Sequence, residues 1–352
     1  MSEHRILLDV QNLKTYFPIR GGIMHKAVGY VHAVEDVSFS IREQETFGLV
    51  GESGCGKSTT GRTILRLIEP TAGRILFDGD DLCALGHEEM RRQRRNMQLV
   101  FQDPYASLNP RMTVRKLLAE PLLTHFQLTP QELEEQVQWM AAAVGLAPEQ
   151  LDRYPHQFSG GQRQRISIAR ALICKPKFVV ADEPVSALDV SIQSQILNLL
   201  MGLQRELKLS YLFISHDLNV VRHISNRVGV MYLGRMAELG NTEDVYHRPL
   251  HPYTQALLSA IPKRDPSEVK ERIRLEGDVP SPANPPKGCA FHDRCAHCMG
   301  VCRVRWVKTR QCRGTVLALL LLRLTHALKS TSWSGVRSIS MKYREAFLWR
   351  IP

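Results

Sequence analysis

The amino-acid sequence predicts an α/β fold built on a buried, mainly parallel β-sheet. Short apolar runs bounded by polar or turn residues occur at Thr46–Val50, Gln98–Phe101, Phe178–Ala181 and Tyr211–Ser215, as expected for strands covered on both faces. Before the last run, Ser191–Lys208 carries apolar residues at every third or fourth position, which is typical of a half-buried helix. Strands that alternate with helices in this way form an α/β core.

Length and composition agree with a globular protein. The chain has 352 residues, 43% of them apolar and 23% charged, which suits one large domain with a smaller region attached. The longest apolar run, Val316–Leu322, is far shorter than the roughly 20 residues that a membrane-spanning helix needs. The first residues lack the basic-then-apolar pattern of a secretory signal. We therefore expect a cytoplasmic protein that reaches a membrane through partner subunits.

The positive charge is concentrated at the C-terminus. Residues 303–352 contain eleven Lys or Arg and one acid, Glu345, so this tail accounts for +10 of the formal net charge of +11. A charge confined to a tail says little about the domain before it. We interpret 303–352 as an atypical basic tail produced by a shifted reading frame. The alternative is a tail that binds anionic lipid or nucleic acid.

Two further segments stand out from the strand–helix alternation. The stretch 104–155 lacks clear strands and reads as a helical insertion, in which Thr129–Glu132 forms a capping box for a helix running to about Gly145. Residues 262–286 are rich in proline and charge, and indicate a linker or extended arm.

A glycine-rich segment follows the first apolar run. Gly51–Ser58 fits the pattern G-x-x-x-x-G-K-[ST], and the helix-like segment Lys57–Ile68 continues from it. Glycines let backbone N–H groups turn towards phosphate oxygens, and a helix N-terminus attracts negative charge. We expect Lys57 to reach the β- and γ-phosphates and Ser58 to ligate Mg²⁺. The predicted phosphate-binding residues are Gly51, Glu52, Ser53, Gly54, Cys55, Gly56, Lys57, Ser58 and Thr59.

Two adjacent acids end a later apolar run. Asp182 and Glu183 directly follow Phe178–Ala181, and a buried strand seldom ends in two acids unless a cation lies near them. We expect Asp182 to hold Mg²⁺, directly or through water, and Glu183 to polarise the attacking water. The predicted ligands are therefore ATP and Mg²⁺.

The segment Phe158–Gln162 (FSGGQ) resembles the signature of ABC-type ATPases, and other motifs follow in that family's order. Gln102 is similar to the family's Q-loop glutamine, Ser186–Asp189 to its D-loop and His216 to its switch histidine. Tyr16 resembles the aromatic residue that stacks on adenine, and the two alternatives for this role are Phe17 and Tyr30.

This resemblance implies a fold and a division of labour. The fold is a P-loop ABC ATPase cassette over 5–260, with a RecA-like core, an antiparallel β subdomain and a helical subdomain at about 104–165. ABC ATPases pair head to tail, so the signature and D-loop would serve the nucleotide of the partner subunit. The residues implied for that role are Ser159, Gly160, Gly161, Gln162 and Asp189. The implied catalytic residues are Glu183, His216 and Gln102, and the implied Mg²⁺ ligands are Ser58, Gln102 and Asp182.

A second resemblance narrows the family. Leu250–Thr254 (LHPYT), Glu276–Pro282 and Val100–Pro110 are typical of ATPases of oligopeptide/dipeptide importers. The likeness extends to about residue 302, so 261–302 is expected to be the small C-terminal region of that type. It implies import of di- or oligopeptides across the cytoplasmic membrane. The implied partners are a second ABC ATPase, two membrane permease subunits and an extracytoplasmic peptide-binding protein, with no specific nucleic acid.

Other functions share parts of this pattern. Importers of nickel, glutathione, haem or sugars use the same type of ATPase. Soluble ABC ATPases that act on ribosomes or DNA form a different class, and they commonly carry two cassettes or a long coiled-coil insertion. This sequence has one cassette and no sustained heptads, which favours the importer.

Five of the eight cysteines lie close together near the C-terminus. In a cytosolic chain such clustering favours a metal site over disulfides. An iron–sulfur cluster is one interpretation, zinc with His292 or His297 is another, and unligated thiols in a packed lobe are the third. The expected ligands are Cys289, Cys295 and Cys302, with Cys298 or Cys312 as the fourth.

Overall fold

The computed structural model describes residues 5–21, 26–261 and 272–304. The first part of the predicted linker, the basic tail beyond residue 304 and Cys312 lie outside the described residues. No helix among the described residues is long and apolar enough to cross a membrane.

A six-stranded sheet forms the centre of the fold, in the order β10-β9-β3-β8-β7-β6. Neighbouring strands pair in parallel, except that β9 and β10 are antiparallel. The strands are β3 (Thr46–Val50), β6 (Met97–Val100), β7 (Phe178–Asp182), β8 (Ser210–Ile214), β9 (Arg227–Tyr232) and β10 (Arg235–Asn241). All four predicted strands are confirmed, and β6 and β8 each begin one residue earlier than expected. Every residue of β3, β7 and β8 is buried, which explains their continuous apolar runs.

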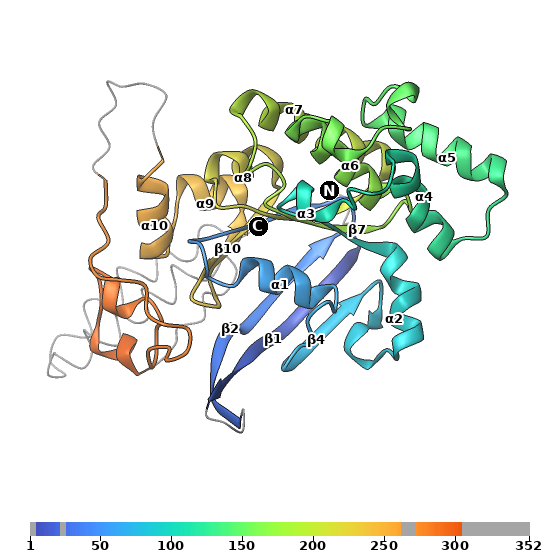
Figure 1. The fold of residues 1–352 in the computed structure, drawn as a ribbon. Helices are drawn as coiled ribbons and strands as arrows, with labels where there is room; N and C mark the ends of the chain where they lie inside the picture. The colour runs from blue at the N-terminus through green and yellow to red at the C-terminus, as the bar shows by residue number, and fades with distance from the viewer. Residues whose placement is uncertain (1–4, 22–25, 262–271, 305–352) are drawn as a thin grey trace, which may run out of the picture. The chain divides into compact units, whose positions relative to one another are not determined.

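A second, antiparallel sheet packs against the first. Its order is β2-β1-β4-β5, with β1 (Ile6–Gly21), β2 (Lys26–Arg42), β4 (Ala72–Phe77) and β5 (Asp80–Asp81). The helix α1 (Lys57–Ile64) contacts strands of both sheets, and Figure 1 shows it alongside β1 and β2. One hydrophobic core joins the two sheets, where Phe39 of β2 stacks on Phe47 of β3 with ring centroids 4.7 Å apart. This sheet is the antiparallel β subdomain that the family resemblance implied.

Helices cover the other face of the central sheet and share a second core with it. They are α3 (Pro104–Ser107), α4 (Val114–His125), α5 (Pro130–Ala143), α6 (Gly160–Leu172), α7 (Val190–Leu207), α8 (Leu218–Ile224), α9 (Thr242–His247) and α10 (Pro252–Ser259). The helix α2 (His87–Gln93) instead packs through Met90 into the core that joins the two sheets. Short 3₁₀ turns lie at Leu82–Ala84, Arg94–Asn96, Pro148–Gln150, Pro155–Gln157, His292–Arg294 and Gly300–Arg303. The helical insertion, the Thr129 capping box and α7 are confirmed.

The helix after the glycine-rich segment is shorter than predicted. It ends at Ile64 and not at Ile68. Arg66 has φ of 48°, the left-handed conformation that stops an α-helix. Apolar residues continue after Ile64, so the sequence pattern predicted a longer helix. A left-handed conformation at a non-glycine residue cannot be recognised from that pattern.

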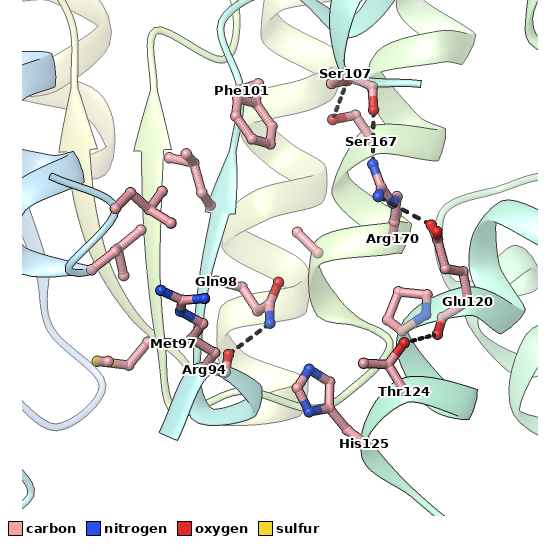
Figure 2. Close-up of a pocket in the computed structure, with 15 residues that line it drawn as sticks. Arg94, Met97, Gln98, Phe101, Ser107, Glu120, Thr124, His125, Ser167 and Arg170 are labelled. Atoms are coloured by element: carbon pink, nitrogen blue, oxygen red, sulfur yellow. Dashed lines mark hydrogen bonds and ion pairs between the residues drawn. The ribbon is translucent and has the colours of Figure 1, made fainter. Parts of the chain in front are cut away.

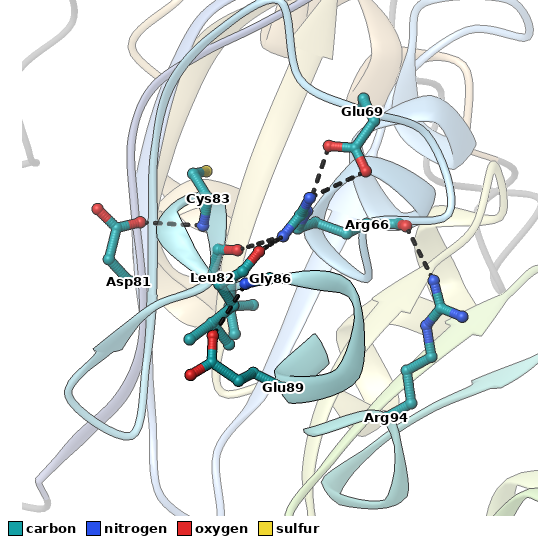
Figure 3. A network of polar contacts seen from close by, with 9 residues as sticks. Arg66, Glu69, Asp81, Leu82, Cys83, Gly86, Glu89 and Arg94 are labelled. Carbon is teal, nitrogen blue, oxygen red and sulfur yellow. Dashed lines mark hydrogen bonds and ion pairs between the residues drawn. The ribbon is translucent and has the colours of Figure 1, made fainter. Parts of the chain in front are cut away.

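Arg66 also connects the end of α1 to the segment that follows β5. Its Nη1 donates to the carbonyl oxygens of Leu82 (2.7 Å) and Leu85 (2.8 Å), and its other nitrogens donate to the Glu69 carboxylate. Figure 3 shows the guanidinium between these groups, with Arg94 donating to the Arg66 carbonyl from the side of β6. The side chain of Arg66 is 16% exposed and its bonds to Leu82 and Leu85 are partly buried, whereas Glu69 is 69% exposed.

We expect Arg66→Gln to lower the free energy of unfolding by about 2 kcal/mol, because two shielded carbonyl groups lose a charged donor. Urea unfolding measures this. Arg91→Gln is the matched control, since the Arg91 side chain is 56% exposed and pairs only loosely with Glu88 at 3.6 Å. Equal midpoints for the two variants would show that the Arg66 contacts do not stabilise the fold.

Candidate functional site

The glycine-rich segment connects β3 to α1: Gly51–Gly56 form the loop, and Lys57 and Ser58 are the first residues of α1. Gly56 has φ of 101°, and a Cβ atom there would lie 2.1 Å from the Ala33 carbonyl oxygen. Gly51 has φ of 152°, and a Cβ atom there would lie 2.2 Å from the Met231 carbonyl oxygen. Only glycine fits at both positions. The tertiary packing therefore requires the two glycines that the motif contains.

Two side chains from the start of α1 make the main polar contacts of this loop. Lys57 is 4% exposed, and its ammonium group donates to the carbonyl oxygens of Gly51 (2.9 Å) and Glu52 (3.0 Å). The Ser58 hydroxyl donates to Oδ1 of Asp182 at 2.7 Å. Burial raises the pKa of Asp182, while the Ser58 hydrogen bond opposes that shift. A hydroxyl and a carboxylate therefore meet beside a buried ammonium group.

Three predicted residues converge where neighbouring strands end. Gln102 follows β6, Glu183 follows β7 and His216 follows β8. Gln102 Nε2 donates to Oε2 of Glu183 at 3.0 Å, and His216 Nδ1 lies 3.1 Å from Oε1 of the same carboxylate. Because the strands are parallel and adjacent, their carboxyl ends meet at one edge of the sheet.

Glu183 has a strained backbone. Its φ of 48° is unusual for a residue with a side chain. The backbone N–H of Glu183 donates to the Ile214 carbonyl oxygen at 2.9 Å, which ties this conformation to the end of β8. Eight other described non-glycine residues, Arg66 among them, also have positive φ, so it is the contacts of the Glu183 carboxylate that mark the site.

These residues line one open cavity of about 400 Å³. The lining residues are Val31, Ala33, Ser53, Gly54, Gly56, Lys57, Ser58, Thr59, Gln102, Glu183, His216 and Pro282. Several residues at or near this cavity were not among the predicted site residues. Pro282 comes from the C-terminal region, and its carbonyl oxygen accepts from the His32 N–H at 2.9 Å. Arg62 lies 3.5 Å from Asp182, and its place one turn after Ser58 on α1 is the only sequence feature that indicated it.

The signature residues do not line this cavity. Ser159 caps α6, its hydroxyl accepts from the Gln162 N–H, and the Gln162 side chain accepts from the Ser159 N–H at 3.1 Å. A Cβ atom at Gly161 would lie 2.6 Å from Ile192, so α6 and α7 approach closely there. Ser159 and Asp189 are exposed, and Gly160 is partly exposed. Within one chain, the signature and the glycine-rich loop form separate sites.

The adenine-stacking residue stays a prediction. Tyr16 is not among the cavity residues; its ring packs 4.2 Å from that of His32, and its hydroxyl donates to Glu35. The neighbours of His32 along β2, Val31 and Ala33, do line the cavity. The alternatives Phe17 and Tyr30 are 39% and 51% exposed.

The described cysteines are all free thiols, and those near the C-terminus are partly buried. Burial raises the pKa of Cys289 and Cys295, which favours the neutral thiol. Among the residues that the structure describes, no group of three or more His, Cys, Asp or Glu side chains is arranged to hold a metal ion. The expected iron–sulfur or zinc site at Cys289, Cys295, Cys298 and Cys302 therefore finds no support in this geometry.

A second cavity, of about 310 Å³, lies between β6 and the helical insertion. Figure 2 shows Arg170 of α6 at its edge, donating to the Ser107 carbonyl oxygen (2.7 Å) and pairing with Glu120 of α4 (3.2 Å). Phe101, which precedes Gln102, points into the same space, and Leu67 lines it after the end of α1. This cavity thus borders both the helical insertion and the segment that carries Gln102.

The loop between β3 and α1 has the geometry of a phosphate-binding loop, and the Ser58–Asp182 pair lies next to it. The neighbouring strand ends supply a carboxylate that Gln102 and His216 contact. Together these features define a P-loop nucleotide triphosphatase. Family models match "ABC transporter" at residues 34–186 and "Oligopeptide/dipeptide transporter, C-terminal region" at residues 237–302. The chain belongs to the ATPases of the ABC transporter family, with the oligopeptide/dipeptide type of C-terminal region.

Similar proteins agree with this assignment. The oligopeptide transport ATP-binding protein AppF of Bacillus subtilis is 58% identical over 300 residues, covering 84% of this chain and 91% of the relative. A probable peptide ABC transporter ATP-binding protein of Sinorhizobium fredii is 52% identical, covering 84% of each chain. Among solved structures, the ATP-binding cassette MJ0796, a dimer bound to ADP and Pi, gives a TM-score of 0.60 at 27% identity, covering 67% of this chain and 98% of that one.

Proposed function

We propose that this chain binds and hydrolyses ATP as the energising subunit of an ABC importer for di- and oligopeptides at the cytoplasmic face of the cell membrane. The observation that carries the proposal is the Glu183 carboxylate, contacted by Gln102 and His216 in the cavity that the glycine-rich loop lines. The peptide cargo rests on the C-terminal region at 237–302 and on the peptide transporters named among the relatives.

The loop residues from Gly51 to Thr59 would bind the phosphates of ATP through backbone N–H groups and the Lys57 ammonium group. Ser58 and Asp182, with Gln102, would hold Mg²⁺. Their hydroxyl, carboxylate and amide oxygens are the hard donors that this cation prefers, and the 2.7 Å contact between Ser58 and Asp182 brings two of them together. When bound, Mg²⁺ neutralises charge on the phosphates.

Glu183 would act as the base in hydrolysis. A water molecule bonds to the γ-phosphorus, the bond from that phosphorus to the bridging oxygen of ADP breaks, and the proton of the water passes to Glu183. Gln102 and His216 hold the two carboxylate oxygens in place. His216 is 57% exposed and therefore accessible to the γ-phosphate and the attacking water.

A second ATPase subunit would complete each site. Ser159, Gly160, Gly161 and Gln162 lie together at the exposed N-terminus of α6, which suits a γ-phosphate presented by a partner. Asp189 is exposed at the start of α7 and would join that interface. The dimeric state of the solved MJ0796 cassette supports this arrangement. The partner is either a second copy or a related ATPase.

The second cavity is the proposed docking place for a segment of a membrane permease subunit. Its wall includes Phe101, adjacent to the Gln102 that contacts Glu183, so a segment bound there would affect the catalytic carboxylate. Arg170 ties α6 to the Ser107 carbonyl and to Glu120 of α4. Arg170 lies in the last turn of α6, so a displaced helical insertion would also pull on the C-terminal end of the helix that begins with the signature.

Affinity isolation of the full chain from detergent-solubilised membranes tests the importer. We expect two permease subunits, a second ATPase and a peptide-binding protein to copurify. Leu67→Asp should reduce permease recovery at least about tenfold, because it places a charge in the apolar part of the interface. Ile6→Asp is the control, since Ile6 is 52% exposed and lies outside the cavity.

Permease recovery that is equal for both variants would contradict docking at this cavity. Copurification with ribosomes or DNA, without permeases, would favour the soluble class of ABC ATPase instead. Peptide-stimulated ATP hydrolysis in reconstituted vesicles distinguishes peptides from nickel, glutathione, haem or sugars. A binding protein that stimulates turnover only with one of those other cargoes would contradict the peptide assignment.

A further inference from the structure

Glu52 of the glycine-rich loop is held by two residues from the C-terminal part of the chain. The backbone N–H of Glu52 donates to the Tyr253 hydroxyl oxygen at 2.9 Å. The Arg294 guanidinium donates through Nη1 to Oε2 of Glu52 at 3.0 Å. Tyr253 lies on α10 and Arg294 lies in the 3₁₀ turn His292–Arg294. Both the backbone and the side chain of one loop residue therefore depend on segments far along the chain.

Tyr253 belongs to a packed aromatic cluster, and Arg294 lies three residues after another member of it, Phe291. Tyr253 is fully buried, and its ring lies edge-on to that of Tyr232 at the end of β9, with centroids 4.7 Å apart. Phe291, 1% exposed, lies 5.2 Å from Tyr232 and 5.4 Å from Tyr253. Such a cluster resists displacement, because separating the rings exposes a large apolar area. The cluster thus fixes Tyr253 and the segment next to Arg294 against the end of β9 in the central sheet.

The Arg294 contact is also well shielded. Its side chain is 10% exposed and that of Glu52 is 29% exposed. An ion pair in such a setting interacts more strongly than one in open water, and its geometry is better defined. The pair therefore orients the loop as well as neutralising two charges.

A third contact links Glu52 to the proposed phosphate-binding cation. The carbonyl oxygen of Glu52 accepts from the Lys57 ammonium group at 3.0 Å, and that of Gly51 accepts at 2.9 Å. A shift of Glu52 therefore moves the groups that orient Lys57. Such a shift would weaken the bonds from Lys57 to the phosphates, because hydrogen bonds depend steeply on distance and angle.

We propose that Arg294 and Tyr253 are positioning residues of the glycine-rich loop, through which the C-terminal region sets the affinity of the site for ATP. The inference rests on the proposed binding of ATP by this loop. It assigns a role in nucleotide binding to the region 237–302, which is similar to the C-terminal region of oligopeptide/dipeptide transporters.

Titration calorimetry of the full chain with ATP and Mg²⁺ tests this role. Arg294→Gln should weaken ATP binding about tenfold, because the Glu52 carboxylate loses a charged partner. Arg294→Lys should recover part of the affinity, since it keeps the charge and loses the forked geometry. Tyr253→Phe removes only the hydroxyl group and should weaken binding about threefold. In steady-state hydrolysis KM should rise while kcat changes little, because neither residue contacts Glu183.

Arg272→Gln is the matched control, because Arg272 is exposed and lines the same open cavity, of about 510 Å³, as Arg294 and Glu52. Glu52→Gln completes a double-mutant cycle. If Arg294 acts through Glu52, adding Arg294→Gln to Glu52→Gln should cost less than about twofold in affinity. Thermal unfolding of each variant separates lost affinity from lost structure. If Arg294→Gln fails to fold, Tyr253→Phe and the partly exposed Glu52→Gln still test the contacts.

The outcomes separate the two proposals. A wild-type chain that does not bind ATP overturns the proposed function. A wild-type chain that binds ATP, with unchanged affinity in Arg294→Gln and Tyr253→Phe, overturns only the positioning role. Equal weakening by Arg272→Gln, or additive effects in the cycle, would also overturn it.

Discussion

Glu183→Gln is expected to reduce ATP turnover at least about a hundredfold while the chain still binds ATP. The substitution keeps the size of the side chain and its ability to contact Gln102 and His216. It removes the carboxylate oxygen that would accept the proton of the attacking water. Since Glu183 does not belong to the phosphate-binding loop, the affinity for ATP should change little.

Two measurements check this expectation. Release of inorganic phosphate at saturating ATP reports turnover, and calorimetry with ATP and Mg²⁺ reports binding. Glu149→Gln is the control, because Glu149 is exposed in the helical insertion, away from the cavity. Turnover equal to that of the wild type would rule out Glu183 as the base. A parallel loss of ATP binding would show that Glu183 supports the structure of the site.

Lys57→Met is expected to weaken ATP binding by about a hundredfold, because charge-assisted hydrogen bonds to the phosphates are lost. Met preserves most of the apolar stem of this buried side chain, so the fold should survive. The carbonyl oxygens of Gly51 and Glu52 lose their donor, which adds to the disturbance of the loop. Hydrolysis should fall with occupancy and recover partly at high ATP.

Calorimetry again gives the dissociation constant, and thermal unfolding confirms that the variant is folded. Lys116→Met provides the control, since Lys116 is exposed on α4. An unchanged dissociation constant in Lys57→Met would contradict a phosphate contact. A large loss of thermal stability would point to Lys57 as a structural residue of the loop.

Parts of this fold could be predicted because the residues that define them are close together in the sequence. The strand Thr46–Val50, the turn glycines and Lys57 are adjacent in the chain, so their order alone indicates a phosphate-binding loop. The strand that ends in Asp182 and the capping box at Thr129 are local in the same sense. The end of α1 near Arg66 could not be predicted from neighbouring residues. Many residue types adopt the left-handed backbone conformation when the tertiary structure requires it.

The family resemblance implied that Gln102, Glu183 and His216 are catalytic residues, but the contacts of Gln102 and His216 with the Glu183 carboxylate were not predicted. Nothing local specifies that β6, β7 and β8 are neighbours, because strand pairing is decided by packing across the whole sheet. The Arg294–Glu52 pair, which spans 242 positions along the chain, had no sequence signal.

The sequence by itself thus determined the chemistry of the proposed site: the loop, its cation, the strand-end acids and the family. Only the tertiary structure decided which distant groups hold that chemistry in place. The motifs consist of residues that are close together in the sequence. The contacts that position Glu52 and Glu183 form only after apolar burial has brought separate strands and the C-terminal region together.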